Sequence, residues 1–414
     1  MNKPVLPDYT NSIVNLSCSI QKHFGVPVRH NTLPAADAVL AENYKHVAVL
    51  LLDGLGINIL EKHLAPDAFL RSNLLTAYSS VFPPTTTAST TSMLSGLTPI
   101  EHGWLGWDVY FKQIDKTVTC FSGTVADTKE PAAPFHVTYK YLPYKSIHTL
   151  INEANAGDRC EPGDGSVVAD LVFPFGPKPF PNLDAWIAEI KRQASLDKRT
   201  FTYAYWENPD HDLHSKGGDS PVVHEVVQDL NARIEKLCSE LADTIVFVTA
   251  DHGHIDVENE CYETDFPELE KMFSRQPSIE PRGTSFFIKP EYLKPACSPG
   301  KADSTGSPEK ADSTGSPEKA DCAPGHDTEF AREFERLFGN DYVLFTHDEV
   351  FEKQIFGTGE ANENLTGIGD YVAAAVGHRT IYPTKYMYGK NFKSHHAGMT
   401  EAEMKIPLIC WKSR

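Results

Sequence analysis

The sequence is short of basic side chains, of paired cysteines and of long apolar runs. Its eight cysteines are scattered without a CxxC pair or zinc-finger spacing, which indicates reduced thiols rather than a disulfide framework. Lysine and arginine number 38 against 56 acidic residues, and the net charge of -18 argues against nucleic acid or an anionic membrane as a partner. No apolar run could cross a bilayer, and the N-terminal MNKPVLPDYTNS has no signal-peptide core. We therefore expect a soluble, cytoplasmic protein.

Apolar residues are plentiful enough for a sizeable core, since they make up 41% of the chain. Continuous apolar runs at 46–52, 200–206 and 244–250 are typical of strands that are buried on both faces of a parallel sheet. A helix with Ser220 as its cap and Pro221 in its first turn joins the last two runs, which predicts a β-α-β unit with parallel strands. We predict an α/β fold with a mostly parallel central sheet and helices on both faces.

The domain organisation follows from composition. We expect residues 1–45 to pack on the core as an N-terminal extension, and 46–111 with 165–414 to form the main α/β domain. Residues 112–164 have weak periodicity and many turn residues, so we interpret them as an inserted cap. Within the main domain, 298–326 contains the repeat KADSTGSPE, which cannot bury apolar area and predicts a disordered linker.

Aspartate and histidine side chains stand beside several predicted strands. They are Asp53 after the first run, Asp210 and His214 after the second, Asp251 and His252 after the third, and His396 ahead of the last strand. Because parallel strands present their carboxyl ends at one edge of a sheet, we expect these side chains to lie together. Such a set without cysteine suits Zn²⁺, with Mn²⁺ or Fe as substitutes, and two ions could clamp a phosphoryl group.

A hydroxyl-rich run, TTTASTTS, begins at Thr85 after Pro83-Pro84 and predicts a helix N-terminus. Free backbone N-H groups there favour an anion, although for an isolated run the commoner role of the hydroxyls is to cap the helix. The aromatic residues that follow, Trp104 and Trp107 among them, fit a stacking wall for a planar group and core packing about equally well.

Five motifs in this order resemble one family. They are DGLG after the first strand, FPPTTTASTTSMLSGLTPIEHG, NPDHDLH, TADHGH, and HHAGMT followed by EMKIPLI. Together they resemble the alkaline phosphatase superfamily and, within it, the type I phosphodiesterase/nucleotide pyrophosphatase family. The resemblance implies two bound metal ions. One ion would be held by Asp210, His214 and His396, and the other by Asp53, Asp251 and His252.

The resemblance also implies a threonine nucleophile at the start of the helix beside the second ion. Counting back from Gly96 places it on Thr86, with Thr85 or Thr87 as the alternative for a one-residue slip. Ser89 stands where the family usually has an asparagine that contacts a phosphate oxygen, and we expect it to help carry the developing charge. His254 and His395 are alternative metal ligands, although one of two adjacent histidines is more often not a ligand.

The activity implied by the resemblance is hydrolysis of a phosphodiester or pyrophosphate bond, through a phosphothreonine intermediate at a two-zinc site. The substrate would be a small phosphate ester, with a nucleotide as one candidate. A phosphomonoesterase or phosphonate hydrolase of the same superfamily remains open, because the metal ligands are shared. A cofactor-independent phosphomutase and a metal-binding or phosphate-sensing protein without activity are further alternatives.

Overall fold

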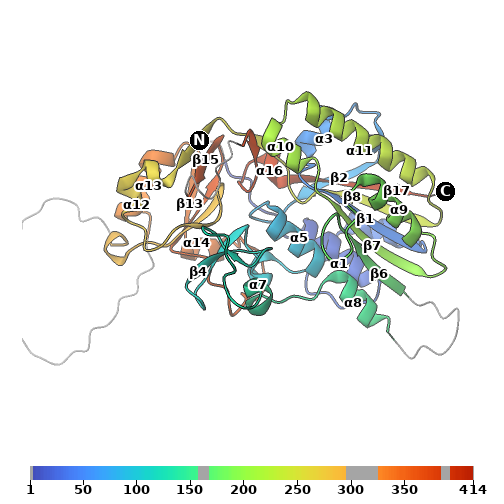
Figure 1. The fold of residues 1–414 in the computed structure, drawn as a ribbon, viewed down its shortest axis with the longest axis horizontal. Helices are drawn as coiled ribbons and strands as arrows, with labels where there is room; N and C mark the ends of the chain where they lie inside the picture. The colour runs from blue at the N-terminus through green and yellow to red at the C-terminus, as the bar shows by residue number, and fades with distance from the viewer. Residues whose placement is uncertain (1–2, 157–166, 295–324, 384–391, 414) are drawn as a thin grey trace, which may run out of the picture.

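The structure is a computed structural model that describes residues 3–156, 167–294, 325–383 and 392–413. Two large sheets, of six and seven strands, lie side by side along the longest axis of the molecule (Figure 1). The six-stranded sheet carries most of the helices. The predicted repeat linker falls almost wholly outside the described residues. Within the described part of the chain, no helix is long and apolar enough to cross a membrane.

The six-stranded sheet has the order β2-β17-β8-β1-β7-β6. Its strands are β1 (His46–Leu52), β2 (Leu74–Ser79), β6 (Val167–Val172), β7 (Arg199–Trp206), β8 (Thr244–Thr249) and β17 (Lys405–Lys412). The four strands β6, β7, β1 and β8 run parallel, whereas β17 is antiparallel to β8 and β2. Every residue of β1 and β8 is buried, which explains their continuous apolar runs.

Helices cover both faces of this sheet (Figure 1). Those that pack together on one face are α1 (Ile13–His23), α5 (Thr86–Ser95) and α8 (Ile147–Ala154). On the other face lie α3 (Ile57–His63), α4 (Phe69–Ser72), α10 (Asp210–Lys216) and α11 (Pro221–Ser239), with α9 (Leu183–Gln193) beside β6 and β7. The α11 helix has Ser220 as its cap and proline at its start, as predicted. The α/β fold class predicted from the sequence is confirmed.

The second sheet is antiparallel and has the order β13-β14-β12-β11-β3-β4-β5. Its strands are β3 (Asp108–Phe111), β4 (Lys116–Thr119), β5 (Thr124–Val125), β11 (Ser278–Glu280), β12 (Gly283–Phe286), β13 (Tyr342–Thr346) and β14 (Tyr371–Ala375). The amphipathic helix α13 (Glu329–Phe338) packs its phenylalanines on one face. Residues 116–125, which we predicted as part of a cap, therefore share a sheet with strands from much later in the chain. The domain boundaries themselves stay a prediction.

Shorter elements accompany the two sheets, besides the 3-10 helices Glu263–Asp265 and Pro290–Tyr292. They are α2 (Pro34–Leu40), α6 (Pro99–His102), α7 (Val137–Tyr141), α12 (Pro267–Glu270), α14 (His347–Glu352), α16 (Glu401–Met404), and the pairs β9 (Ile255–Asp256) with β16 (Ser394–His395) and β10 (Asn259–Tyr262) with β15 (Arg379–Tyr382). The β9–β16 pair matters most for the site, because it joins the segment after β8 to the segment that contains His396.

Candidate active site

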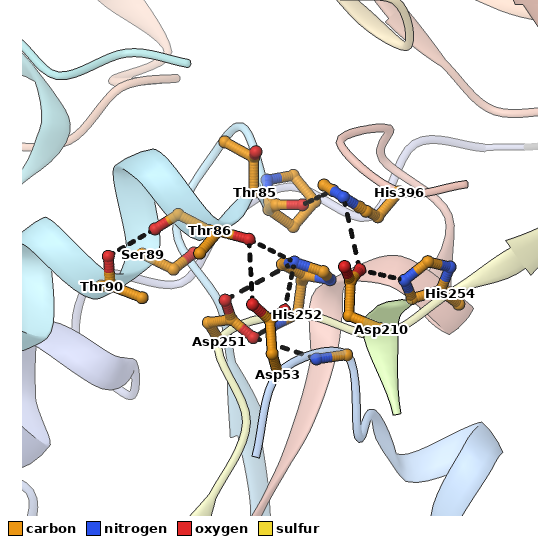
Figure 2. Close-up of polar contacts among 12 residues, drawn as sticks. Asp53, Thr85, Thr86, Ser89, Thr90, Asp210, Asp251, His252, His254 and His396 are labelled. Atoms are coloured by element: carbon orange, nitrogen blue, oxygen red, sulfur yellow. Dashed lines mark hydrogen bonds and ion pairs between the residues drawn. The ribbon is translucent and has the colours of Figure 1, made fainter. Parts of the chain in front are cut away.

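The metal-capable side chains converge where three parallel strands end. The register pairs Leu52 of β1 with Trp206 of β7, and Leu51 with Thr249 of β8. The residues that follow these strands therefore emerge at one edge of the sheet, and the Asp210 N-H donates to the Asp53 carbonyl at 3.0 Å. Figure 2 shows the result, with the three aspartates facing a group of imidazole rings. The predicted ligands form two clusters.

The first group, which we call the carboxylate cluster, comprises Asp53, Asp251 and His252. All three are buried, and one oxygen of each aspartate, Asp53 Oδ1 and Asp251 Oδ2, has no hydrogen-bond partner among the described residues. His252 Nε2 lies 3.2 Å from the former oxygen and 3.5 Å from the latter. Two buried carboxylates with unpartnered oxygens are costly unless a proton or a cation lies between them.

The electrostatics of this cluster reflect that cost. Burial raises the pKa of Asp53, and the nearby Asp210 carboxylate adds to the shift. Burial and then Asp53 likewise raise the pKa of Asp251 well above its usual range. For His252, burial lowers the pKa, but the neighbouring carboxylates outweigh burial and bring the pKa to about 10. The cluster therefore attracts positive charge.

The second group, the histidine cluster, comprises Asp210, His214, His254 and His396. Asp210 Oδ1 lies 2.6 Å from His254 Nε2, 3.4 Å from His214 Nε2 and 3.7 Å from His396 Nε2. Burial raises the pKa of Asp210, but the His214 and His254 rings outweigh it and hold the pKa below its usual range. Burial lowers the pKa of His254 to about 4. A neutral His254 ring is therefore favoured beside an ionised Asp210 carboxylate.

Hydrogen bonds to the far side of each ring set its tautomer. The Nδ1 atom of His396 lies 3.1 Å from the Pro84 carbonyl, and that of His214 lies 2.9 Å from the Ser394 carbonyl. A carbonyl can only accept, so we assign the hydrogen to Nδ1 in both rings. Each Nε2 lone pair then points toward Asp210. This is how proteins orient imidazole ligands for a metal ion, and the donor sets of both clusters fit divalent cations such as Zn²⁺.

The two alternative histidine ligands, His254 and His395, have different environments in the structure. His254 belongs to the histidine cluster, and its Nδ1 lies 3.1 Å from Ser394 Oγ. The ring of His395 belongs to neither cluster, and its Nδ1 accepts the His396 N-H at 2.9 Å. Its Nε2 is buried and has no hydrogen-bond partner among the described residues. His254 is therefore a fourth histidine-cluster residue that can bind a metal or orient Asp210.

The three threonines at the start of α5 have different environments. Thr86 is the one residue between Tyr78 and Gly96 that is not buried. Its hydroxyl lies 3.3 Å from both Asp53 Oδ2 and His252 Nε2 (Figure 2). Thr85 is the N-cap residue but makes no side-chain cap hydrogen bond, and the buried Thr87 hydroxyl has no partner among the described residues. Helix capping therefore does not account for this run.

Ser89 lies one turn further along α5 and is fully buried. Its hydroxyl is 2.9 Å from Ser80 Oγ, and Ser80 donates to the Asp251 carbonyl at 2.5 Å. Since Ser80 uses its hydrogen on that carbonyl, the Ser89 hydroxyl donates to Ser80. A contact with a phosphate oxygen would require the Ser89 hydroxyl to turn away, so its catalytic role stays a prediction.

The two tryptophans predicted as alternatives for stacking or packing differ in exposure. Trp104 is fully buried in the core beneath the second sheet and donates to the Leu142 carbonyl at 2.9 Å. Trp107 is 43% exposed, and its ring lies 5.8 Å from that of Phe121. Core packing therefore explains Trp104, whereas the exposed ring of Trp107 is still compatible with stacking on a planar group.

Two contacts at the site were missed by sequence reasoning. The Tyr205 hydroxyl donates to Asp53 Oδ2, the oxygen that also faces Thr86. Its place in β7, one residue before the strand ends, could have signalled this contact. Glu280 accepts a hydrogen bond from Thr85 Oγ1 at 2.7 Å, and nothing near it in the sequence indicated that contact.

Comparison with known proteins shows the family to which the chain belongs. A family model described as type I phosphodiesterase / nucleotide pyrophosphatase matches residues 47–291, more than half of the 414 residues. The chain belongs to this family. Its membership confirms the resemblance drawn from the five motifs, and members are phosphodiesterases and nucleotide pyrophosphatases that depend on metal ions.

Solved structures of ectonucleotide pyrophosphatase/phosphodiesterase 5 share the fold. The murine protein, in an inactive threonine-to-alanine form in complex with AMP, is 16% identical over 87% of each chain, with a TM-score of 0.56. The human protein is 14% identical over 88% of this chain and 87% of its own, with a TM-score of 0.57. No curated protein sequence matches this family member. At these identities the likeness establishes an alkaline phosphatase-like fold.

Proposed function

We propose that this family member hydrolyses a phosphodiester or pyrophosphate bond of a small substrate, with Thr86 as the nucleophile beside two divalent cations, Zn²⁺ first among the candidates. The observation that carries the proposal is the position of the Thr86 hydroxyl. It is the accessible hydroxyl of the run and faces Asp53 and His252. The murine structure in complex with AMP supports a nucleotide as the substrate class.

The cations would be held by the carboxylate cluster and the histidine cluster, where they would supply positive charge to the attacking, leaving and non-bridging oxygens. Thr86 Oγ1 forms a bond to phosphorus while the bond to the leaving oxygen breaks on the opposite side. Asp53 Oδ2 and His252 Nε2 lie 3.3 Å from Thr86 Oγ1 and are the candidates to receive its proton. Water then cleaves the phosphothreonine bond and restores the hydroxyl.

The start of α5 provides further stabilisation. Because the Thr85 side chain caps none of the first backbone N-H groups, they are open to oxygens of the phosphoryl group. The helix dipole favours negative charge at the same place. Thr86, the first residue of α5, therefore presents the substrate to a site that is suited to an anion.

Hydrolysis of a chromogenic phosphodiester and of the matching monoester, with zinc or with a chelator, tests the proposal. We expect zinc-dependent diester turnover that falls about a thousandfold or more in Thr86→Ala. Thr87→Ala is the matched control, because it removes a buried hydroxyl without a partner one position away. Loss of turnover in Thr87→Ala but not in Thr86→Ala would identify Thr87 as the nucleophile. A monoester preference would favour a phosphomonoesterase, and no turnover despite bound zinc would favour a sensor.

A further inference from the structure

The hairpin of β11 and β12 contacts both the start of α5, which we call the nucleophile helix, and the segment that contains His396, and the mechanism above does not use it. Glu280 pairs with Gly283 across the turn residues Pro281 and Arg282. The turn is held from within, because Thr284 Oγ1 donates to the Glu280 carbonyl at 2.7 Å. Both ends of this turn contact segments that carry site residues.

Glu280 contacts the nucleophile helix. One carboxylate oxygen, Oε1, accepts from Thr85 Oγ1 at 2.7 Å and from the Trp107 backbone N-H at 2.7 Å. Glu280 is 6% exposed and Thr85 is 1% exposed, so water cannot readily replace this contact. In Figure 2 the Thr85 hydroxyl points away from the aspartates, whereas its neighbour Thr86 points toward Asp53 and His252.

The Thr85 contact departs from what an N-cap residue usually does. A threonine at this position normally accepts a hydrogen bond from the first turn of its helix, and Thr85 instead donates its hydrogen to Glu280. The helix therefore loses a cap and gains a link to the second sheet. That link ends one residue before the proposed nucleophile.

The backbone that carries Glu280 is tightly held. Ile279 has φ +86°, a left-handed conformation that is unfavourable for a β-branched residue. Its carbonyl lies so close to Gly106 that a Cβ there would approach it to 2.7 Å. Strain of this kind persists only where the surroundings fix the chain, so the position of the Glu280 carboxylate is well defined.

The other end of the turn holds the His396 segment. The buried Arg282 guanidinium pairs with both oxygens of Glu403, at 2.7 and 2.9 Å, and the Gly398 N-H donates to the same carboxylate at 2.7 Å. A Cβ at Gly283 would meet the Ala397 carbonyl at 2.7 Å. One four-residue turn therefore locks the backbone on both sides of the site.

We infer that Glu280 is a positioning residue, which holds Thr85 so that the Thr86 hydroxyl stays directed at Asp53 and His252. It acts through Thr85 and does not touch the substrate. A glutamate that only satisfied buried donors would affect stability, whereas a positioning residue affects the rate at saturating substrate. Because kcat can be measured only in an active enzyme, this part of the inference rests on the proposed function.

The experiment compares Glu280→Leu with Glu280→Gln, and Thr85→Val with Thr85→Ser, on the full chain with zinc. The Gln and Ser variants keep the acceptor and the donor, so we expect kcat close to that of the wild type. The Leu and Val variants remove them, and we expect kcat to fall about tenfold to a hundredfold with KM unchanged, since small misplacements of reacting groups cost this much. In the double variant Thr85→Val with Glu280→Leu, kcat should equal that of the worse single variant.

Hydrogen exchange of the peptide 82–89 provides a readout that needs no turnover. We expect faster exchange in the Leu and Val variants and wild-type exchange in the Gln and Ser variants. If Glu280→Leu does not fold, the Thr85 pair decides alone. Unchanged kcat and exchange in folded Thr85→Val, or single effects that multiply in the double variant, would overturn the inference. An inactive wild type would overturn the proposed function instead, and the exchange measurement would still decide the inference.

Discussion

The carboxylate cluster and the histidine cluster differ in how far their buried charges are balanced by neighbouring residues. In the carboxylate cluster two buried aspartates leave one oxygen each without a hydrogen-bond partner among the described residues, and burial raises the pKa of both. In the histidine cluster a single aspartate lies among rings that commit Nδ1 to carbonyl or hydroxyl groups, and its pKa is lowered. The first cluster needs added positive charge to be stable, whereas the second is largely satisfied by its own residues. The clusters should respond differently to mutation and to metal removal.

The largest effect is expected from neutralising the carboxylate cluster. Asp251→Asn removes one of two charges that face the same space, so we expect loss of one of two bound zinc equivalents and a fall in diester turnover of about a thousandfold or more. Zinc stoichiometry by elemental analysis, together with kcat/KM, measures both. Asp212→Asn, in the same region but in neither cluster, is the control.

The same substitution should have the opposite effect on the metal-free protein. Without metal, two buried carboxylates repel each other, so Asp251→Asn should raise the stability of the chelated protein by about 1–3 kcal/mol. Asp210→Asn should lower it, because Asp210 Oδ1 lies at hydrogen-bond distance, 2.6 Å, from His254 Nε2. Urea unfolding in the presence of a chelator gives both values. Equal changes in the free energy of unfolding for the two variants would contradict the proposed difference between the clusters.

A smaller effect is expected in the histidine cluster from His254→Gln. Loss of a ligand or of a residue that orients one typically costs about 10–100-fold in metal affinity. We expect this loss for one zinc equivalent, measured by competition with a chromogenic chelator. His395→Gln, in β16, is the matched control, and its zinc affinity should stay unchanged because His395 belongs to neither cluster.

The smallest effect should come from Tyr205→Phe. The hydroxyl of Tyr205 donates to Asp53 Oδ2, and a hydrogen bond to a charged group contributes about 1.5–3 kcal/mol. The bound cation would compensate for part of this, so we expect a fall in kcat/KM of about tenfold with both zinc equivalents retained. Tyr203→Phe is the control, since that buried hydroxyl has no partner among the described residues.

The six-stranded sheet could be predicted from the sequence because each of its parallel strands carries its own signal. Runs such as HVAVLLL and TIVFVTA are apolar throughout, and each ends in the polar residues that form the site. The apolar runs alone therefore suffice to place the predicted ligands Asp53, Asp210 and Asp251 at one edge of the sheet. The choice of Thr86 depended on family spacing, and the structure adds a difference in burial that no sequence pattern shows.

The seven-stranded sheet could not be predicted in the same way. Its strands come from segments as distant as Asp108–Phe111 and Tyr371–Ala375, and their pairing depends on contacts across the whole chain. The contact between Glu280 and Thr85 spans 195 residues and joins two ordinary polar side chains. The assignment of His254 rather than His395 to the cluster likewise depends on the position of each ring, because both rings have Nδ1 in a hydrogen bond and it is the Nε2 of His254 that lies 2.6 Å from Asp210 Oδ1.

The most direct test of the central claim is to trap the covalent intermediate. The enzyme would be mixed with excess diester and zinc, quenched in acid within its first turnovers, digested, and examined by mass spectrometry for a phosphoryl adduct on the peptide 78–96. We predict an adduct on Thr86 in the wild type and in Thr87→Ala, and none in Thr86→Ala. An active enzyme with no adduct, or with one on Thr85 or Thr87, would contradict the account.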